Sequence, residues 1–287
     1  MSKSLRSYRT AAGAVTAALA LALTGCFSDS GSSTVSEGCT PQHQFSTVQE
    51  GALTVATYAF PPHTVIEGDQ LSGIEGDLLH EFARRECLTL VVSSAGGATA
   101  AVPSVQTGRA DLAAGDWWRT KDRAKVVSLS DPLYLDQGAI VSKAGYKSLA
   151  ELDGKKIGSV GGNLWNDELK KAFGNNFTVY QDGESVFNDL AAGRIDAVID
   201  SVGATTARFQ TTPIEGAQIL PLPPDPRVAT SRHPGQVNWP TSKDNPELTA
   251  AINAQIAAMH ADGTIVKTLE KYGLDASAAD VGQPMEL

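Results

Sequence analysis

Arg123 is the residue in this sequence with the clearest potential to bind an anion. Thr120 is expected to cap a short helix through Lys125, which places Arg123 in the first turn beside free backbone N–H groups. A guanidinium group there can bind a carboxylate with two parallel hydrogen bonds, helped by the positive end of the helix. The alternative is a surface arginine paired with Asp122 or Asp131, and spacing alone favours that alternative.

Asp200 is the residue best suited to bind a cation. It ends an apolar strand that follows Gly193, and a carboxylate at a strand end that faces a cleft can balance an ammonium group. The alternative is that Asp200 caps the next helix, which is a common role for aspartate. The two roles are compatible with each other.

The tryptophans are concentrated in two loops. Aromatics make up only 6% of the chain, yet three of the four tryptophans lie at Trp117, Trp118 and Trp165. Asn163 and Leu164 directly precede the last of these. Aromatic faces attract cations, and cages of them bind alkylated ammonium groups. The alternative is that Trp117 packs in a core while Trp118 and Trp165 only narrow a cleft.

Strand-like and helix-like segments alternate from Gly51 onward. The expected strands span residues 53–56, 90–92, 111–114, 156–160, 177–180 and 193–200. The expected helices span residues 75–83, 101–107, 120–125, 167–173, 185–192, 245–259 and 264–272. This alternation predicts parallel sheets with helices on both faces, an α/β fold. Ligands of such sheets bind outside the carboxyl ends of the strands, so the loops after Ala56, Ala114, Val160 and Ile199 are the places to search.

Two local patterns bear on the organisation of these elements. Gly108-Arg109-Ala110-Asp111 recurs 85 residues later as Gly193-Arg194-Ile195-Asp196, each time between an expected helix and an expected strand. Two similar α/β units are the simplest explanation, although four residues can recur by chance. Ser148 and Glu151 match the spacing of a capping box.

The first 26 residues are typical of a secretion signal. Lys3, Arg6 and Arg9 precede an apolar run over residues 11–25, which is shorter than the ~20 residues of a membrane-spanning helix. The run ends at Leu23-Thr24-Gly25-Cys26, which resembles the bacterial lipobox, in which the cysteine is acylated and becomes the first mature residue. An ordinary signal peptide with a chance cysteine is the alternative. We therefore predict a signal peptide over residues 1–25 and a lipidated, flexible tether over residues 26–50.

Charge and cysteine content exclude several functions. The net charge is −9, and loss of the three leader cations makes the mature chain −12, with no basic block that would bind nucleic acid. Cys39 and Cys87 remain as an even pair in an oxidising compartment, which allows a disulfide. The five histidines are scattered, so no metal site is expected. No nucleophile elbow, phosphate loop or dinucleotide fingerprint occurs, so no cofactor is expected.

Four segments resemble the family 3 extracytoplasmic solute-binding proteins, the amino-acid receptors of ABC importers. They are Gly73-Ile74-Glu75-Gly76-Asp77-Leu78, Thr120-Lys121-Asp122-Arg123-Ala124-Lys125, Ser130-Asp131-Pro132-Leu133-Tyr134 and Lys243-Asp244-Asn245-Pro246-Glu247-Leu248. The resemblance covers nearly all of residues 51–273. It implies a two-lobe fold like that of type II periplasmic binding proteins, each lobe a central sheet flanked by helices, joined by two crossing strands. Lobe 1 is expected at residues 51–140 and 236–287, and lobe 2 at residues 141–235.

The resemblance also implies roles for single residues. Arg123 matches the arginine that binds the ligand's α-carboxylate, and Asp200 matches the acid that binds its ammonium group. This chain departs from the family elsewhere: Tyr58 stands where an acid is expected, with Phe60 as the aromatic that follows. Trp118 falls where a ligand-bonding Ser or Thr is usual, and Asp116 stands beside it at a small-residue position. These departures imply a ligand that is bulkier or more alkylated than a common amino acid.

These observations lead to one predicted function with two alternatives. The predicted ligand-binding residues are Tyr58, Phe60, Asp116, Trp117, Trp118, Arg123, Asn163, Leu164, Trp165 and Asp200. We expect a monomeric, extracytoplasmic lipoprotein, anchored to the membrane through Cys26, that captures an amino acid or related ammonium-bearing carboxylate by hinge closure and delivers it to an ABC permease. The chain is not expected to be an enzyme. A receptor for a signalling partner is one alternative, and a dehydratase-type enzyme using Asp116 as acid or base is the other.

Overall fold

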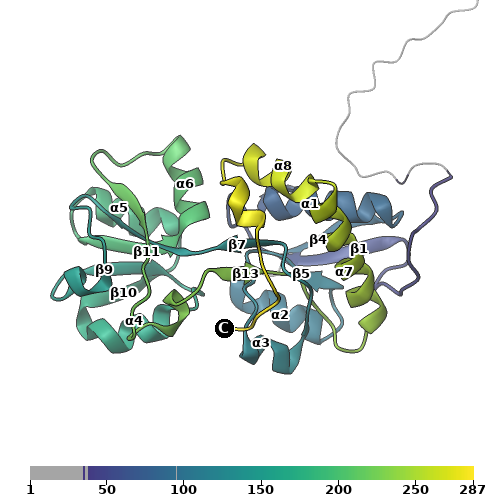
Figure 1. Cartoon of the computed structure of the whole chain (residues 1–287), viewed down its shortest axis with the longest axis horizontal. Coiled ribbons are helices and arrows are strands. Elements are labelled where there is room, and N and C mark those ends of the chain that lie inside the picture. The colour runs from purple at the N-terminus through teal and green to yellow at the C-terminus, as the bar shows by residue number, and fades with distance from the viewer. Residues whose placement is uncertain (1–34, 36–37, 95) are drawn as a thin grey trace, which may run out of the picture. The chain divides into compact units, whose positions relative to one another are not determined.

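The computed structural model describes residue 35 and residues 38–94 and 96–287. The predicted signal peptide, Cys26 and most of the predicted tether lie outside the described residues. Within residues 38–287 the chain forms two α/β lobes, which appear on the right and left of Figure 1. The predicted fold class is therefore confirmed.

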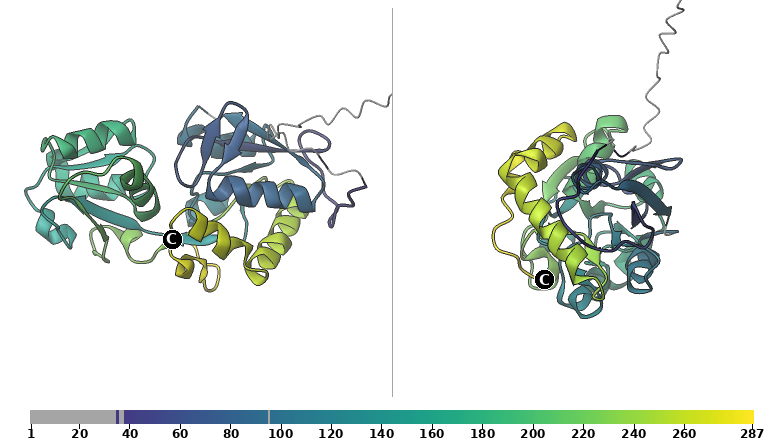
Figure 2. Two further views of the ribbon diagram at one scale, coloured as in Figure 1. Left: turned by 90° about the horizontal axis from the view of Figure 1, so that it is seen from above. Right: turned by 90° about the vertical axis from the view of Figure 1, so that its right-hand side faces the viewer.

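Lobe 1 is built on a five-stranded sheet in the order β4-β1-β5-β14-β6. Its strands are β1 (Ala52–Thr57), β4 (Thr89–Ser94), β5 (Leu112–Ala113), β6 (Ser128–Leu129) and β14 (Pro240–Thr241). Its helices are α1 (Ile74–Arg85), α2 (Ala98–Gln106), α3 (Lys121–Val126), α7 (Pro246–Ala261) and α8 (Thr264–Lys271). A small hairpin of β2 (Val65–Glu67) and β3 (Gln70–Ser72) precedes α1. Figure 2 shows the last helices, α7 and α8, beside α1 near the start of the chain.

Lobe 2 is built on a second five-stranded sheet in the order β10-β9-β11-β8-β12. Its strands are β8 (Gly138–Ser142), β9 (Ile157–Val160), β10 (Phe177–Tyr180), β11 (Ala197–Ser201) and β12 (Gln218–Pro221). Its helices are α4 (Asn166–Phe173), α5 (Gly183–Ala191) and α6 (Val202–Thr211). Short 3-10 turns lie at Leu149–Leu152, Gly174–Asn176 and Ala229–Ser231, and a fourth, Ala276–Ala279, belongs to the C-terminal segment.

Both sheets carry the same arrangement of parallel strands. In lobe 1, β1 lies between β4 and β5, and in lobe 2, β9 lies between β10 and β11. The two glycines of the repeated motif, Gly108 and Gly193, end α2 and α5 with left-handed backbone (φ 67° and 70°) and lead into the strands β5 and β11. The sequence repeat therefore marks two similar α/β units.

Hydrophobic burial explains why these segments form layers. All six residues of β1 are buried, as expected for a parallel strand covered on both faces by helices. In α1, Leu78, Leu79 and Phe82 recur at helical spacing and are fully buried against the sheet. The layers place the carboxyl ends of β1, β9 and β11, and the loops that follow them, along one edge of each lobe.

Two antiparallel strands connect the lobes: β7 (Tyr134–Asp136) and β13 (Gly235–Val237). They appear between the two halves of Figure 1. Since β8 already belongs to the lobe 2 sheet, the first crossing ends near residue 137 rather than at the predicted residue 140. The C-terminal segment packs on the second crossing strand, where Gln236 Nε2 donates to the carbonyl oxygens of Val281 and Gln283.

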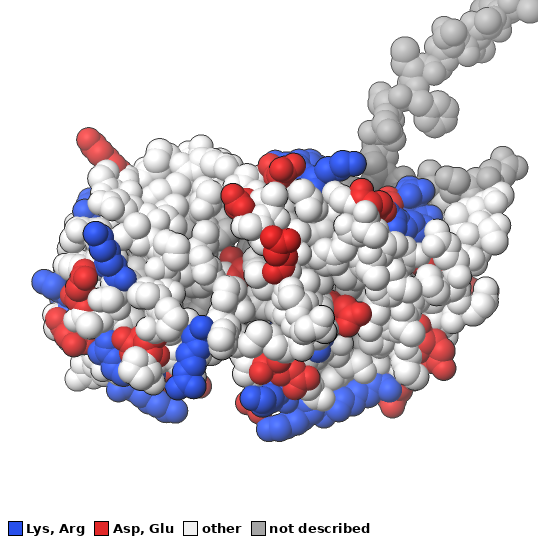
Figure 3. Space-filling view, in the orientation of Figure 1, with Lys and Arg blue, Asp and Glu red and all other residues white. Residues whose placement is uncertain are grey.

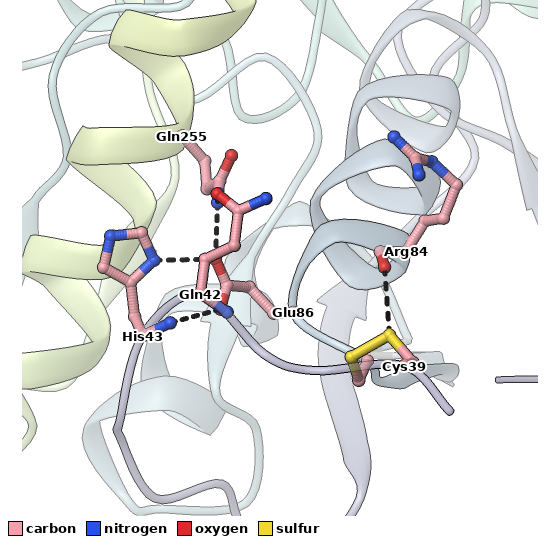
Figure 4. Close-up of a disulfide and its surroundings, with 7 residues drawn as sticks. Cys39, Gln42, His43, Arg84, Glu86 and Gln255 are labelled. Atoms are coloured by element: carbon pink, nitrogen blue, oxygen red, sulfur yellow. Dashed lines mark hydrogen bonds and ion pairs between the residues drawn. A yellow bond between two sulfur atoms is a disulfide. The ribbon is translucent and has the colours of Figure 1, made fainter. Parts of the chain in front are cut away.

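The last part of the predicted tether, from Cys39 onward, packs on lobe 1. Cys39 forms a disulfide with Cys87, with 5.7 Å between their Cα atoms, and the segment after it packs on lobe 1 (Figure 4). The backbone N–H groups of Gln42 and His43 both donate to the buried carboxylate of Glu86. The folded domain therefore begins near Cys39, and the tether prediction to residue 50 is too long.

One cap was predicted incorrectly and one correctly. Ser148 makes no capping hydrogen bond, and Glu151 instead accepts from Lys147 N at 3.0 Å, so the predicted capping box does not form. Thr120 caps α3 as predicted, with its hydroxyl accepting from Arg123 N at 3.2 Å. In the described part of the chain, no helix is sufficiently long and apolar to span a membrane. Figure 3 shows lysine, arginine and acidic side chains interspersed along the lower edge of both lobes.

Candidate ligand-binding cleft

A cleft of about 790 Å³ lies between the two lobes. It is lined by the loops that follow β1, β5, β9 and β10, by the end of β11, and by parts of α5 and α6. Its lining includes all ten residues predicted to bind ligand: Tyr58, Phe60, Asp116, Trp117, Trp118, Arg123, Asn163, Leu164, Trp165 and Asp200. The structure thus brings together residues spread over more than 140 positions of the sequence.

Arg123 is held in the cleft wall by aromatic and backbone contacts. Its Nη1 donates to the carbonyl oxygen of Trp118 at 2.5 Å, and its guanidinium lies 4.7 Å from the ring centroid of Trp117. Burial lowers the pKa of Arg123 to about 10, so the side chain is still a cation at neutral pH. Asp122 pairs with Lys125 instead, and Arg123 forms no ion pair with any described residue. The alternative of a surface ion pair is therefore wrong.

Asp200 lies on the lobe 2 side of the cleft at the end of β11. It is 3% exposed, and its Oδ1 accepts from Ser201 N at 2.9 Å and from Asn163 Nδ2 at 3.3 Å. Burial raises the pKa of Asp200 to about 6. Ser201, rather than Asp200, caps α6 by accepting from Ala204 N. The alternative of a helix-capping aspartate is therefore wrong by one residue.

Trp118 and Trp165 meet across the cleft near the crossing strands. Their ring centroids are 5.6 Å apart in an edge-on arrangement, and both side chains are almost completely buried. Trp118 packs flat on Gly235, where a Cβ atom would overlap the indole ring. Trp165 Nε1 donates to Ser159 Oγ at 3.0 Å. This geometry matches the interpretation in which the two tryptophans narrow the cleft, and each still contributes to its lining.

Tyr58 and Phe60 form an aromatic wall on lobe 1. Their rings stack with centroids 6.0 Å apart, and Tyr58 OH donates to Gly115 O at 2.8 Å. Burial and the nearby Asp116 and Glu75 raise the pKa of Tyr58, so the phenol is neutral. This wall is apolar where the family resemblance implies an acid.

Asp116 has an unusual environment for an aspartate. Its backbone is left-handed (φ 58°), and its side chain is 8% exposed. Oδ2 accepts from Trp118 Nε1 at 3.2 Å, while Oδ1 has no hydrogen-bond partner among the described residues. Burial, together with the neighbouring carboxyl groups of Asp136 and Glu75, raises the pKa of Asp116 well above its ordinary value.

Arg208 and Phe187 are among the lobe 2 residues that line the cleft and that sequence reasoning missed. The Arg208 guanidinium lies 5.0 Å from the Phe187 ring centroid, and its buried Nε has no partner in the described structure. Arg208 is on α6, a helix the sequence analysis did not predict at all. The signal that was available is the cap at Ser201, which follows a predicted strand end.

Comparisons with known proteins place this architecture in a family. Residues 53–275 match the sequence model of the bacterial extracellular solute-binding proteins, family 3. The lysine/arginine/ornithine-binding periplasmic protein of Escherichia coli strain K12 is 28% identical over 229 residues, which cover 76% of this chain and 85% of that protein. The histidine-binding periplasmic protein of Salmonella typhimurium is 28% identical over 213 residues, covering 71% of this chain and 79% of that protein.

A solved structure agrees with these relatives. An ancestral arginine-binding protein bound to glutamine superposes with a TM-score of 0.66 at 28% identity, covering 78% of this chain and 99% of that one. The relatives are solute-binding proteins rather than enzymes, as predicted. Since the family match extends over most of the chain, this protein belongs to the family 3 bacterial extracellular solute-binding proteins.

Proposed function

We propose that this protein captures an amino acid in the cleft and delivers it to an ABC permease. The observation that supports this most strongly is the pair of opposite charges on opposite lobes, Arg123 in lobe 1 and Asp200 in lobe 2, which line one cleft. An amino acid carries a carboxylate and an ammonium group on one carbon atom. It can therefore satisfy both poles only by bridging the lobes.

The part of the cleft around Arg123, which would bind the ligand's carboxylate, contains more than one hydrogen-bond donor. Trp117 lines the cleft next to Arg123, and its buried Nε1 has no acceptor among the described residues. A carboxylate that pairs with Arg123 would offer this N–H group a partner as well as the guanidinium. The buried guanidinium and indole thus form a site that is incomplete without an anion.

The rest of the lining favours a ligand with a cationic or alkylated side chain. Aromatic faces are contributed by Tyr58, Phe60 and Trp165, and Asp200 supplies a buried carboxyl group. Aromatic faces and carboxylates both stabilise a cation. The names of the relatives, which include lysine, arginine, ornithine and histidine binding, make basic amino acids the first probes to test.

Binding with hinge closure requires no covalent step. A ligand held by both lobes stabilises the closed form through its higher affinity for that form, and the crossing strands β7 and β13 form the connection about which the lobes move. The closed form is then the state that docks on the permease.

A thermal screen of the purified protein tests the proposal. At about 100 times its dissociation constant, the correct amino acid should add about 2.7 kcal/mol of apparent stability. L-arginine, L-lysine, L-ornithine and L-histidine come first, followed by trimethylated ammonium carboxylates and neutral amino acids. If no carboxylate that bears an ammonium group raises the melting temperature, the proposal fails.

We also propose that the protein is a lipoprotein anchored through Cys26. The lipobox-like sequence and the extracellular family support this, and the folded domain begins near Cys39, which leaves twelve residues between them as a tether. Cys26→Ala should release the protein from the membrane fraction, whereas Ser28→Ala should leave it anchored. Retention of Cys26→Ala in the membrane fraction would contradict acylation at this residue.

A further inference from the structure

A buried cluster of His63, Asp116 and Asp136 lies at the junction of lobe 1 and the crossing strand β7. The three residues come from the loop after β1, the loop after β5 and the last position of β7. One ring nitrogen of His63 and one carboxylate oxygen from each aspartate lie within 4.8 Å of one another. His63 is fully buried, Asp136 is 4% exposed, and the Asp116 side chain is 8% exposed. Only Asp116 also lines the cleft.

The cluster has acceptors without donors. His63 Nε2, Asp116 Oδ1 and Asp136 Oδ2 are buried and have no hydrogen-bond partner among the described residues. The second oxygen of each aspartate is used, by Trp118 Nε1 for Asp116 and by Gly203 N for Asp136. Buried carboxylates need a compensating positive charge, and ionised carboxylates cannot donate to each other. The residues of the cluster therefore require a bound cation or proton.

The hydrogen bonds of His63 leave its Nε2 as a free lone pair. Nδ1 lies 2.7 Å from the hydroxyl oxygen of Tyr134, and that hydroxyl lies 3.4 Å from Glu75 Oε1. If the tyrosine donates to the carboxylate, Nδ1–H donates to the tyrosine, which assigns the tautomer from the network. A histidine whose other nitrogen is held by a hydrogen bond is the usual form of a metal ligand.

Gly203 keeps space open beside this lone pair. A Cβ atom at Gly203 would lie 3.1 Å from His63 Nε2 and 3.5 Å from Asp136 Oδ1. His63 Nε2 and Asp136 Oδ1, the oxygen that accepts from Gly203 N, therefore both lie close to Gly203 at the start of α6, while the ring nitrogen nearest to Asp116 Oδ1 is Nδ1, at 3.9 Å. Any larger residue at position 203 would crowd this space.

We propose that His63, Asp116 and Asp136 bind a divalent transition-metal ion, with Zn²⁺ as the best match. Imidazole nitrogen and carboxylate oxygen are both ligand types that Zn²⁺ accepts, and a Zn²⁺ ion held by three residues takes its fourth ligand from water. Ca²⁺ and Mg²⁺ prefer ligands that are all oxygen, so the histidine argues against them. The bound ion would join the cleft wall at Asp116 to the crossing strand at Asp136. It would thereby fix the position of Asp116 in the cleft.

The first experiment measures metal directly in the unaltered protein. Untagged protein is freed of metal with EDTA, incubated with Zn²⁺, desalted and assayed by inductively coupled plasma mass spectrometry. We expect one equivalent of zinc to remain. Substitution with Co²⁺ should give the visible absorption bands of a four-coordinate ion. Zinc content near zero would overturn the proposal, and a proton shared by Asp116 and Asp136 would then account for the cluster.

The second experiment locates the site with matched variants. Loss of a ligand in His63→Gln or Asp136→Asn should weaken zinc binding by at least the 10–100-fold typical of losing an outer-shell partner. The control is His80→Gln, since His80 is a lobe 1 histidine whose ring bonds to Leu71 O, away from the cluster. Circular dichroism in EDTA verifies that each variant folds. Equal zinc retention in wild type and both variants would overturn the assignment.

The metal measurement does not depend on the proposed amino-acid function. Zinc content and the Co²⁺ spectrum are recorded without amino acid, and the thermal screen is recorded on the EDTA-treated protein. Failure of one measurement therefore leaves the other intact.

Discussion

Lobe 1 contains two buried clusters of histidine and carboxylate, and they differ in how completely their polar atoms are bonded. In the first, which we call the Glu86 clamp, Glu86 accepts from Gln42 N at 3.1 Å, from His43 N at 2.9 Å and from His43 Nδ1 at 2.7 Å. Gln255 Nε2, on α7, donates to the same carboxylate at 2.5 Å (Figure 4). Cys87, the residue after Glu86, forms the disulfide with Cys39 beside this clamp.

The second cluster, His63 with Asp116 and Asp136, lies beside the cleft and has three buried polar atoms that find no partner among the described residues. Fully bonded buried groups hold a structure together, whereas unbonded ones cost stability unless something else binds them. The contrast indicates that the clamp attaches the start of the folded chain to lobe 1 and that the cleft cluster serves binding. Changes in the clamp should therefore lower stability without altering binding, and changes at the ligand-binding residues of the cleft should alter binding.

Glu86→Ala should have the largest effect. The substitution removes the acceptor for four hydrogen bonds and takes this partner from the backbone N–H groups of Gln42 and His43, although Gln255 Nε2 keeps its bond to Gln42 Oε1, so the free energy of unfolding should fall by about 3 kcal/mol. Urea denaturation followed by circular dichroism measures the change, and amino-acid affinity should stay unchanged. Glu81→Ala is the control, since Glu81 lies on α1, the helix that Glu86 caps, and pairs with Arg84 and Arg85 through a side chain that is 23% exposed; ion pairs near the surface contribute about 0–1 kcal/mol. Equal losses of stability in the two variants would show that the Glu86 clamp contributes no more than the ion pairs of Glu81.

Arg123→Ala should weaken ligand binding and leave stability almost unchanged, the opposite of Glu86→Ala. Loss of a guanidinium that pairs with the ligand carboxylate should weaken binding of the amino acid selected by the thermal screen about 100-fold, which corresponds to about 2.7 kcal/mol. Isothermal titration calorimetry measures this affinity, and the stability without ligand should change little. Arg109→Ala, at an exposed arginine of the same lobe, should bind normally. If Arg123→Ala binds the amino acid with wild-type affinity, Arg123 does not bind the ligand's carboxylate.

Much of the fold was predictable because it depends on local patterns. Apolar strands such as β1 and β9, and the cap at Thr120, are encoded within a few neighbouring residues. The family resemblance then directed attention to Arg123 and Asp200. Helix α6 was missed because its apolar periodicity is weak, and it buries only Gly203 and Thr205 fully.

The cleft cluster was not predictable from the sequence. His63, Asp116 and Asp136 are far apart in the chain and carry no metal-binding spacing, and the scattered histidines predicted no metal site. They meet because the loop after β1, the loop after β5 and the crossing strand β7 converge at the junction of lobe 1 with the crossing strands. Only tertiary structure brings such residues together, and only the hydrogen bonds among the described residues show that each of the three has one buried polar atom without a partner there.

The affinity for ligand should change about tenfold between pH 7 and pH 5, because Asp200 in the cleft changes its charge in this range. The Glu86 clamp should take no part in this change. With a pKa of about 6 in the folded protein, Asp200 is mostly ionised at pH 7 and mostly protonated at pH 5. Binding of an ammonium group needs the ionised form, so affinity should fall about tenfold from pH 7 to pH 5. Since this folded pKa lies above the unfolded value of about 3.9, the same group makes the unliganded protein lose stability as pH rises from about 4 to 6.

Asp200→Asn is the matched control for this titration. It should bind more weakly at every pH and lose the tenfold change between pH 7 and pH 5, while Glu75 and Asp116 still titrate in the variant. A pH dependence that is identical in wild type and Asp200→Asn would assign the titration to another carboxyl group.

The smallest expected effect comes from replacing a carboxylate by an amide in each of the two clusters. Because the chemical change is the same, it compares the two clusters most directly. Asp136→Asn replaces a buried carboxylate that lacks a full set of donors, so in EDTA it should raise the free energy of unfolding by about 1 kcal/mol. Glu86→Gln replaces a buried carboxylate whose donors are all in place, so it should lower that free energy. With zinc present, wild type should be more stable than Asp136→Asn, because wild type then gains stability from the bound ion and Asp136→Asn does not. Loss of stability in both amide variants under EDTA would show that the two clusters are equally well bonded in solution.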